Sequence, residues 1–219
     1  HALGTPLITN ADGTKFGKSE GNAVWLDAEM CSPYAFYQFW LNTADADVVD
    51  RLKVFTFLTR AEIEEYAQKV ADEPFRREAQ RRLAWEVTAL AHGEETTTKV
   101  IEASQAVFGG GDLTTVDPDT LTAVLAELPQ ADRTQWEGEP GTVTAVELLV
   151  STGLVASRSE ARRTVRDGGA SVNNVRVTDA DQVFTRDDAL AGRHLLVRRG
   201  KKNMAGAGPG GGWPRPQTT

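Results

Sequence analysis

Residues 7–19 read LITNADGTKFGKS and place two lysines and a hydroxyl group on a glycine-containing loop. The Asp12-Gly13 pair within this stretch favours a positive φ and therefore predicts a turn. Lys15 and Lys18 lie three positions apart and can reach different oxygens of one polyphosphate. Such ammonium groups stabilise charge that builds up on a departing pyrophosphate when a loop closes over it. A solvated loop with no ligand is the alternative, because short Lys-x-x-Lys stretches are common and the P-loop spacing is absent.

Helix signals dominate the chain after this loop. Ser32-Pro33 predicts an N-cap followed by proline in the first helical turn. Thr59 with Glu62 predicts a capping box at the start of a later helix. A helix from about Pro74 to Gly93 is expected to carry regularly spaced apolar residues, including Phe75 and Leu90. Two further helices are expected before Pro129, so residues 28–128 are predicted to form an all-helical domain.

The chain changes character after a predicted linker at residues 129–141, which is rich in proline, glycine and charge. In residues 142–202, Thr144 with Glu147 and Ser157 with Glu160 predict two capped helices. The Asn173-Asn174 pair predicts a hairpin turn, and Leu195–Val197 a last strand. This part is expected to be a compact α+β unit. Residues 203–219 are rich in glycine and proline and are expected to be a disordered tail.

The composition bounds the class of protein. The chain has 219 residues, with 40% hydrophobic and 25% charged residues, which is an ordinary globular mixture. No run approaches the ~18 apolar residues of a membrane span, and no signal-peptide pattern opens the chain. The single cysteine, Cys31, excludes an internal disulfide and a cysteine-based zinc cluster. The three histidines show no metal-ligand spacing, so no metal site is predicted.

Charge is distributed unevenly along the chain. Residues 1–140 carry a net charge of −12, whereas residues 141–202 carry +4. Arg158, Arg162 and Arg166 lie four positions apart and share one face of a predicted helix, and such a stripe can track phosphates. Further cations could extend it, namely Arg163, Arg198, Arg199, Lys201 and Lys202. A solubilising helix face is the alternative explanation of the same charges.

The run from Leu7 to Ser19 resembles the signature loop of the class I aminoacyl-tRNA synthetases, in the Lys-Phe-Gly-Lys-Ser form of the bacterial tyrosyl enzymes. The stretch SPYAFYQFWLNTADADV, residues 32–48, and LKVFTFLT, residues 52–59, resemble the helical domain of that family. The stretch LVASRSEARR, residues 154–163, resembles the S4-type RNA-binding domain at the end of the same enzymes. The resemblance therefore extends from residue 1 to about residue 200.

This resemblance implies a fold and an activity. Residues 1–27 would be the end of a Rossmann-like catalytic domain, followed by the helical domain and the S4-like domain, so the fold is mainly α with a small α+β part. The family activates L-tyrosine with ATP, expected as a magnesium complex, and transfers the tyrosyl group to tRNA(Tyr). By motif, Lys15 and Lys18 would contact the ATP phosphates, Gly17 would let the loop swing, and Ser19 would order the loop or bind a phosphate.

Much of what the family needs for catalysis is absent from this sequence. Neither a His-Ile-Gly-His-type motif nor a tyrosine pocket is found, so the chain is expected to be the C-terminal part of a longer cytoplasmic enzyme, inactive alone. The full-length enzyme is expected to be a homodimer without membrane attachment. Two alternatives stay open: a free-standing, non-catalytic S4-type RNA-binding protein, and another RNA enzyme that carries an S4 domain, such as an rRNA-modifying enzyme.

Overall fold

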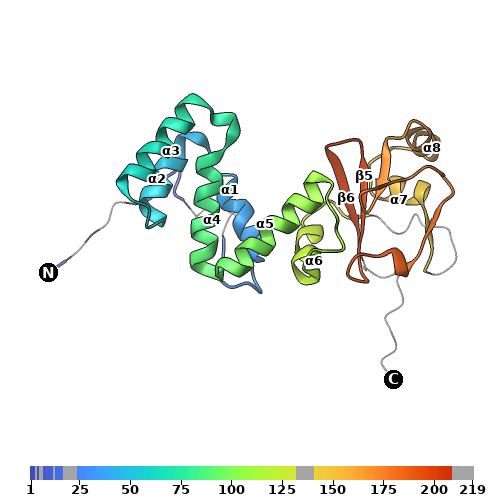
Figure 1. The fold of residues 1–219 in the computed structure, drawn as a ribbon, viewed down its shortest axis with the longest axis horizontal. Helices are drawn as coiled ribbons and strands as arrows, with labels where there is room; N and C mark the ends of the chain where they lie inside the picture. Colours follow the sequence, from blue (N-terminus) through green and yellow to red (C-terminus); the bar gives the residue numbers. More distant parts are fainter. Residues whose placement is uncertain (3, 5–6, 12, 17–23, 132–140, 209–219) are drawn as a thin grey trace, which may run out of the picture. The chain divides into compact units, whose positions relative to one another are not determined.

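The computed structural model describes residues 1, 2, 4, 7–11, 13–16, 24–131 and 141–208. The chain forms two compact units, His1–Val100 and Ile101–Thr219 (Figure 1). They part within a helix, and not at residues 129–141 where the sequence predicts a linker. The finer domain assignments made from the sequence stay predictions. No helix in the described part of the chain is long and apolar enough to cross a membrane.

The N-terminal unit is built from helices, as the sequence predicts. Its elements are α1 (Pro33–Leu41), α2 (Asp45–Phe55), α3 (Arg60–Asp72), the 3-10 turn η1 (Pro74–Arg76), α4 (Glu78–His92) and the first part of α5 (Glu94–Gly109). Helix α4 is the centre of the unit, because it packs against each of α1, α2 and α3 (Figure 1). Leu83 and Ala84 of α4 and Leu52 of α2 are completely buried in the core.

Local hydrogen bonds decide where these helices begin. The Ser32 hydroxyl accepts the Ala35 N–H at 3.1 Å, and Pro33 occupies the first turn of α1. The Thr59 N–H donates to the Glu62 carboxylate at 2.8 Å, while the Glu62 N–H donates to the Thr59 hydroxyl. Each bond satisfies an amide that a helix start leaves without an intrahelical acceptor. Both predicted caps are therefore confirmed.

The prediction of one regular helix from Pro74 to Gly93 is wrong in its first turn. Arg77 has φ +51°, which interrupts the helix between η1 and α4. The Arg77 guanidinium donates to the Leu41 carbonyl at 2.6 Å and ties this bend to the end of α1. Phe75 is 78% exposed and Leu90, near the end of α4, is 65% exposed, so neither belongs to the core.

The C-terminal unit combines short helices with two small sheets. Its elements are α6 (Pro118–Ala126), β1 (Val143–Thr144), α7 (Ala145–Ser151), α8 (Arg158–Arg166), β2 (Ala170–Val172), β3 (Val175–Arg176), β4 (Val183–Phe184), the 3-10 turn η3 (Arg186–Asp188), β5 (Leu195–Arg199) and β6 (Asn203–Ala207). Strands β1 and β4 pair with each other, and the larger sheet is antiparallel in the order β3-β2-β5-β6. Apolar side chains of α7, α8 and β5 share its core, including Leu148, Ala161 and Leu195.

The predicted hairpin is present and turns at the predicted residues. Val172 pairs with Val175, and the intervening Asn173 and Asn174 have φ of +51° and +64°. Asparagine tolerates this left-handed region, which a tight two-residue turn between twisted strands requires. The strand predicted at Leu195–Val197 is present as β5, but it is not the last strand, because β6 follows it.

The prediction of a disordered tail from residue 203 is wrong for its first part. Strand β6 pairs with β5 along its whole length, from Asn203 opposite Arg199 to Ala207 opposite Leu195. Gly206 also bridges Gln130, which lies at the start of the predicted linker. The small residues of β6, which in the sequence suggest low complexity, are suited to this close packing. A Cβ on Gly206 would lie only 2.7 Å from the Gln130 side-chain nitrogen. Residues 132–140 and 209–219 lie outside the described residues.

Candidate functional site

The described part of the first candidate site is the base of the Lys15–Ser19 loop. Thr9 and Lys15 form an antiparallel bridge, and the Phe16 N–H donates to the Ile8 carbonyl at 3.1 Å. The Asn10 N–H donates to the Thr14 carbonyl at 2.8 Å, which closes the turn between its two arms, residues 8–10 and residues 14–16. Lys15 is exposed at the edge of this turn. Gly17, Lys18 and Ser19 lie outside the described residues, so their roles stay predictions.

A buried arginine of α2 contacts both arms of this turn. Arg51 is only 4% exposed, and its Nη2 donates to the Asn10 side-chain oxygen at 2.6 Å. Its guanidinium carbon lies 3.8 Å from the centre of the Phe16 ring, a cation–π contact. Burial lowers the pKa of Arg51, and the nearby charges of Asp47 and Asp50 oppose that shift. Sequence reasoning missed Arg51, because nothing in the local pattern of α2 distinguishes it from a surface arginine.

The Phe16 ring lies in an aromatic cluster contributed by the helical unit. Its centre is 5.7 Å from that of Phe39, 5.6 Å from that of Trp40 and 5.7 Å from that of Phe55. Trp40 is buried and Phe39 is half-buried, so these aromatic side chains belong to the core of the unit. A cavity of about 560 Å³ lies between residues 7–9 and α2 and is lined in part by Arg51. The loop base is thus held by tertiary packing as well as by its own turn.

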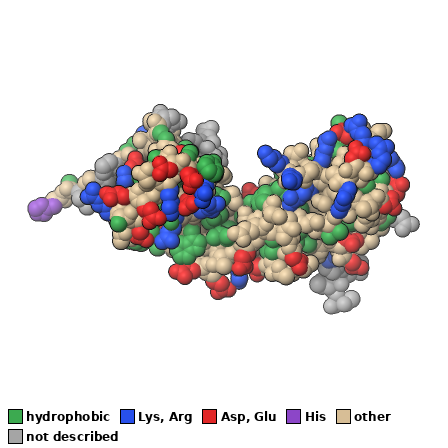
Figure 2. Space-filling view, turned by 45° about the horizontal axis from the view of Figure 1, so that its top comes forward, with side chains coloured by type: hydrophobic (Ala, Val, Ile, Leu, Met, Phe, Trp, Pro, Cys, Tyr) green, Lys and Arg blue, Asp and Glu red, His purple; other side chains and the backbone are tan. Residues whose placement is uncertain are grey.

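The second candidate site is the basic surface of the C-terminal unit, which we define by α8 together with the β5–β6 turn. Arg158, Arg162, Arg163 and Arg166 of α8 are all exposed, as are Lys201 and Lys202 of the turn. The Gly200 N–H donates to the Gly169 carbonyl at 2.8 Å, so the lysine turn lies beside the residues that follow α8. Figure 2 shows Lys and Arg side chains gathered on one side of this unit.

The structure brings one further cation to the basic surface that the sequence analysis did not include. The guanidinium of Arg176 on β3 covers Gly168, because a Cβ built on Gly168 would lie only 1.6 Å from Arg176 Nη2. Gly168 also has φ +71°, so this position is doubly suited to glycine. Arg176 is exposed and extends the basic surface from α8 to the hairpin. In the sequence, the pairing register of the predicted hairpin is the signal that could have placed Arg176 beside α8.

Several of the predicted RNA-binding arginines make contacts within the unit. Arg162 forms an ion pair with Asp181 at 3.1 Å, and Arg166 lies 3.5 Å from Asp167. These pairs are exposed, and such pairs contribute little to stability, so a phosphate can compete for the same guanidinium groups. The cations of α8 thus stay accessible to an anionic partner.

Two of the predicted cations lie at internal positions of the sheet. Arg199 forms an ion pair with Glu160 at 2.8 Å and donates to the Leu154 carbonyl at 2.8 Å. The pKa of the Glu160 carboxyl is lowered, chiefly because it accepts the Ala156 N–H and also because Arg199 is near. Arg198 is half-buried and bonds the Val107 carbonyl, and burial lowers its pKa. Direct RNA contact by Arg198 would require breaking this internal arrangement.

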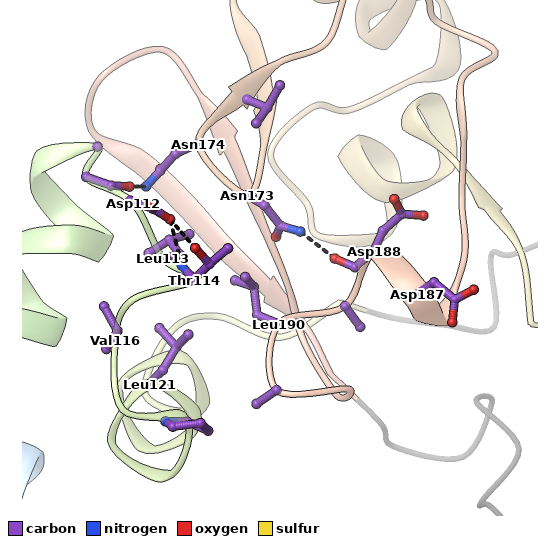
Figure 3. A pocket seen from close by; sticks show the side chains of 16 residues that line it. Asp112, Leu113, Thr114, Val116, Leu121, Asn173, Asn174, Asp187, Asp188 and Leu190 are labelled. Carbon is purple, nitrogen blue, oxygen red and sulfur yellow. Dashed lines mark hydrogen bonds between the residues drawn. The ribbon is translucent and has the colours of Figure 1, made fainter.

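A cavity of about 650 Å³ lies on another part of the C-terminal unit (Figure 3). Its wall includes Leu113 and Leu121, and its acidic side chains are Asp112, Asp187 and Asp188. The Asp112 carboxylate accepts the Thr114 N–H and hydroxyl, which lowers the pKa of Asp112. This acidic wall does not suit a phosphate, so the cavity is separate in character from the basic surface. Among the described residues, no group of three His, Cys, Asp or Glu side chains could hold a metal ion.

Two family models match the chain in tandem. A model described as tRNA synthetases class I (W and Y) matches residues 1–109. A model described as the tyrosine–tRNA ligase SYY-like C-terminal domain matches residues 123–205. The second match ends within β6.

Curated relatives match over nearly the whole chain. A tyrosine–tRNA ligase of Leifsonia xyli is 60% identical over 207 residues, which are 94% of this chain and 45% of that protein. One of Streptomyces avermitilis is 53% identical over 97% of this chain and 49% of that protein. One of Nocardia farcinica is 55% identical over 94% of this chain and 48% of that protein. The chain therefore spans about half the length of the curated relatives it matches.

Solved structures match over a smaller part of the chain. A C-terminally truncated mitochondrial tyrosyl-tRNA synthetase of Aspergillus nidulans shares 39% sequence identity over 40% of this chain and 26% of that chain, with a TM-score of 0.38. The corresponding Coccidioides posadasii structure shares 40% identity over 45% of this chain and 25% of that chain, with a TM-score of 0.39.

Proposed function

Because the chain belongs to the tyrosyl-tRNA synthetase family of the class I aminoacyl-tRNA synthetases, we propose that it is the C-terminal part of a tyrosine–tRNA ligase. The observation that carries this proposal is 60% identity to one such ligase over 94% of the chain. In the reaction, the tyrosine carboxylate attacks the α-phosphorus of ATP, and pyrophosphate leaves with its magnesium ion. A hydroxyl at the 3′ end of tRNA(Tyr) then attacks the tyrosyl carbonyl, and AMP leaves.

In this proposal the Lys15–Ser19 loop serves the first step. Lys15 and Lys18 contact the ATP phosphates, and their ammonium groups bind most strongly as charge develops on the departing pyrophosphate. Binding that strengthens in the transition state raises the rate of activation rather than the affinity for tyrosine. Ser19 binds a phosphate or orders the loop, and Gly17 permits its movement. Lys15 is exposed and lies on a turn that its bridge with Thr9 holds in place, which supports this role.

The second step depends on the tRNA, which we assign to the C-terminal unit. We propose that this unit is an S4-type RNA-binding domain whose sheet includes β6. Exposed cations of α8 and of the β5–β6 turn would track phosphates of the anticodon stem and long variable arm of tRNA(Tyr). Arg198 would act by holding the sheet rather than by touching RNA, because its guanidinium bonds the Val107 carbonyl.

The upstream half of the protein would supply the tyrosine pocket and most of the ATP site. We therefore propose that the 219-residue chain does not catalyse the reaction by itself. The complete enzyme would act as a cytoplasmic homodimer, since translation takes place there and the family is dimeric. An RNA-binding protein without catalytic function remains the competing proposal, and the two differ in the need for the upstream half.

A titration of this chain with tRNA(Tyr) and with a non-cognate tRNA, at two salt concentrations, tests the RNA-binding proposal. We expect binding to weaken with rising salt for both, with a preference for tRNA(Tyr) that survives the higher salt. Weak and equal binding that disappears at higher salt would place the specificity outside this chain.

The catalytic proposal is tested in the protein extended by its upstream half. Lys18→Ala should lower the rate of tyrosine-dependent pyrophosphate exchange and leave the affinity for tyrosine unchanged. An unchanged rate would remove Lys18 from the mechanism. An extended protein with no exchange activity at all would support the competing proposal of a non-catalytic RNA-binding protein.

A further inference from the structure

We infer that Arg51 is a positioning residue that holds the base of the Lys15–Ser19 loop against the helical unit and so sets where Lys15 lies. The inference rests on the proposed function, because it assigns a role to Arg51 in the same phosphate-contacting loop. It adds a residue from α2, thirty-six positions downstream of Lys15, to the parts that the reaction needs.

The contacts of Arg51 join the two arms of the turn. Its Nη2 donates to the side-chain oxygen of Asn10 on the first arm at 2.6 Å. Its guanidinium carbon lies 3.8 Å from the ring centre of Phe16 on the second arm. Lys15 immediately precedes Phe16 and pairs with Thr9, next to Asn10. Because Arg51 restrains the neighbours of both partners in this bridge, it restrains Lys15 without touching it.

A guanidinium is suited to this double contact. Its plane can stack on an aromatic face while its edge donates hydrogen bonds, which an ammonium group cannot do in the same geometry. Loss of water strengthens a cation–π contact, and Arg51 is only 4% exposed. The stacked guanidinium therefore attracts the Phe16 ring and also fixes the position of that ring.

A purely structural role explains Arg51 poorly. Its Nη1 is buried and has no hydrogen-bond partner among the described residues. Within the residues that the structure describes, the only ion-pair partner of Arg51 is Asp47, whose carboxylate is 3.8 Å from Nη2. An incompletely paired buried cation costs stability relative to an apolar side chain of similar size. The arrangement is accounted for if the guanidinium is needed where it is, between Asn10 and Phe16.

Amide hydrogen exchange of the 219-residue chain tests the contact. In Arg51→Met, the amides of Phe16 and Asn10 should exchange about tenfold faster than in the unchanged chain, because the turn opens more often. The amide of Leu83, in the centre of α4, should exchange at the same rate and so report that the helical unit is folded. The matched control is Arg60→Met, at an exposed arginine of α3, which should leave all three amides unchanged.

Two outcomes would overturn the anchoring role. Unchanged exchange at Phe16 and Asn10 in Arg51→Met would mean that Arg51 does not restrain the turn. Equal acceleration at Leu83 would mean that Arg51 supports the whole helical unit and not the loop. Arg51→Lys distinguishes anchoring of the loop from support of the whole helical unit, because it keeps the buried charge but loses the planar stack and the edge-on donor. It should leave Leu83 unchanged and still accelerate exchange at Phe16.

Kinetics of the protein extended by its upstream half test the consequence for the reaction. Arg51→Met should lower kcat of pyrophosphate exchange about tenfold and leave KM for tyrosine unchanged, with Arg51→Lys intermediate and Arg60→Met unchanged. If Lys18→Ala lowers kcat and Arg51→Met does not, the inference fails and the proposed function stands. If Lys18→Ala also has no effect, Lys18 is removed from the mechanism, and if the extended protein has no exchange activity at all, the proposed function itself fails.

Discussion

The guanidinium of Arg198 on β5 donates to the side-chain oxygen of Asn174 at 3.2 Å, and together these residues bind the end of α5 to the sheet. Arg198 also bonds the Val107 carbonyl. The Asn174 amide nitrogen donates to the carbonyls of Ala106 at 3.1 Å and Gly111 at 2.8 Å. Carbonyls in the last turn of a helix have no intrahelical donor, so Arg198 supplies a donor to Val107, and Asn174 adds a second donor to Ala106, whose carbonyl also accepts the Gly111 N–H at 3.0 Å. The hairpin turn thus has a structural task in addition to reversing the chain.

Arg198→Met should destabilise the C-terminal unit. The substitution keeps much of the apolar stem but leaves the Val107 carbonyl without its donor, at a cost of about 1–3 kcal/mol. Urea denaturation followed by circular dichroism measures this cost. The matched control is Arg193→Met, at an exposed arginine in the turn before β5, which should change stability by less than about 0.5 kcal/mol. Equal effects of the two substitutions would deny Arg198 this role.

Reversing two charges on α8 should weaken RNA binding. Arg162 and Arg166 are exposed and lie one turn apart, so Arg162→Glu with Arg166→Glu replaces two cations by two anions on the proposed phosphate track. The affinity for tRNA should fall, and the slope of log K against log salt should become shallower by about 1–2. Arg60→Glu with Lys53→Glu makes the same charge change on the N-terminal unit and serves as the control. Unchanged binding at low salt in the α8 variant would exclude an arginine stripe.

A methyl group on Gly206 should destabilise the sheet at β6. A Cβ there would lie 2.7 Å from Gln130 Nε2 and 3.1 Å from the Leu125 carbonyl oxygen. Because the second neighbour is backbone, Gly206→Ala should cost about 1–3 kcal/mol through overpacking. Gly109→Ala is the matched control, since a Cβ at Gly109 would meet nothing within 4 Å. Thermal denaturation compares the two, and a tolerant Gly206 would contradict the packing of β6 described above.

The stability of the helical unit should fall as the pH drops below the usual pKa of histidine. Burial lowers the pKa of His92 from its usual 6.5, and the ring packs edge-on against Phe36 at 4.9 Å. The unfolded chain therefore binds a proton at a higher pH than the folded one, so stability is complete above pH 6.5 and is lost as the pH falls through the folded pKa.

His92→Gln isolates this contribution from that of the carboxylates. The difference in unfolding free energy between the unchanged chain and His92→Gln should shrink as the pH falls from 7 to about 5, because histidine titrates in this range. Urea denaturation at several pH values measures it. A difference that stays constant across this range would mean that His92 titrates alike in both states.

Hydrogen bonds between residues close in the chain are what the sequence determined. The caps at Ser32, Thr59 and Thr144 and the turn at Asn173-Asn174 each join residues within four positions of one another. Residue type and spacing are enough to specify such bonds, because the chain has few other ways to satisfy these amides. The family resemblance rests on the same kind of local signal, and the comparisons confirm it.

Contacts between distant parts of the chain were decided only by the tertiary structure. Strand β6 is built from small residues that suggest a loose tail, and it is ordered because β5 supplies its hydrogen-bond partners and Gln130 lies against Gly206. Arg51, Arg176 and Arg198 look alike in the sequence. One is buried against Phe16, one covers Gly168, and one holds the end of α5. The physical reason is that burial and long-range pairing depend on which surfaces meet, and a local pattern of residues does not contain that information.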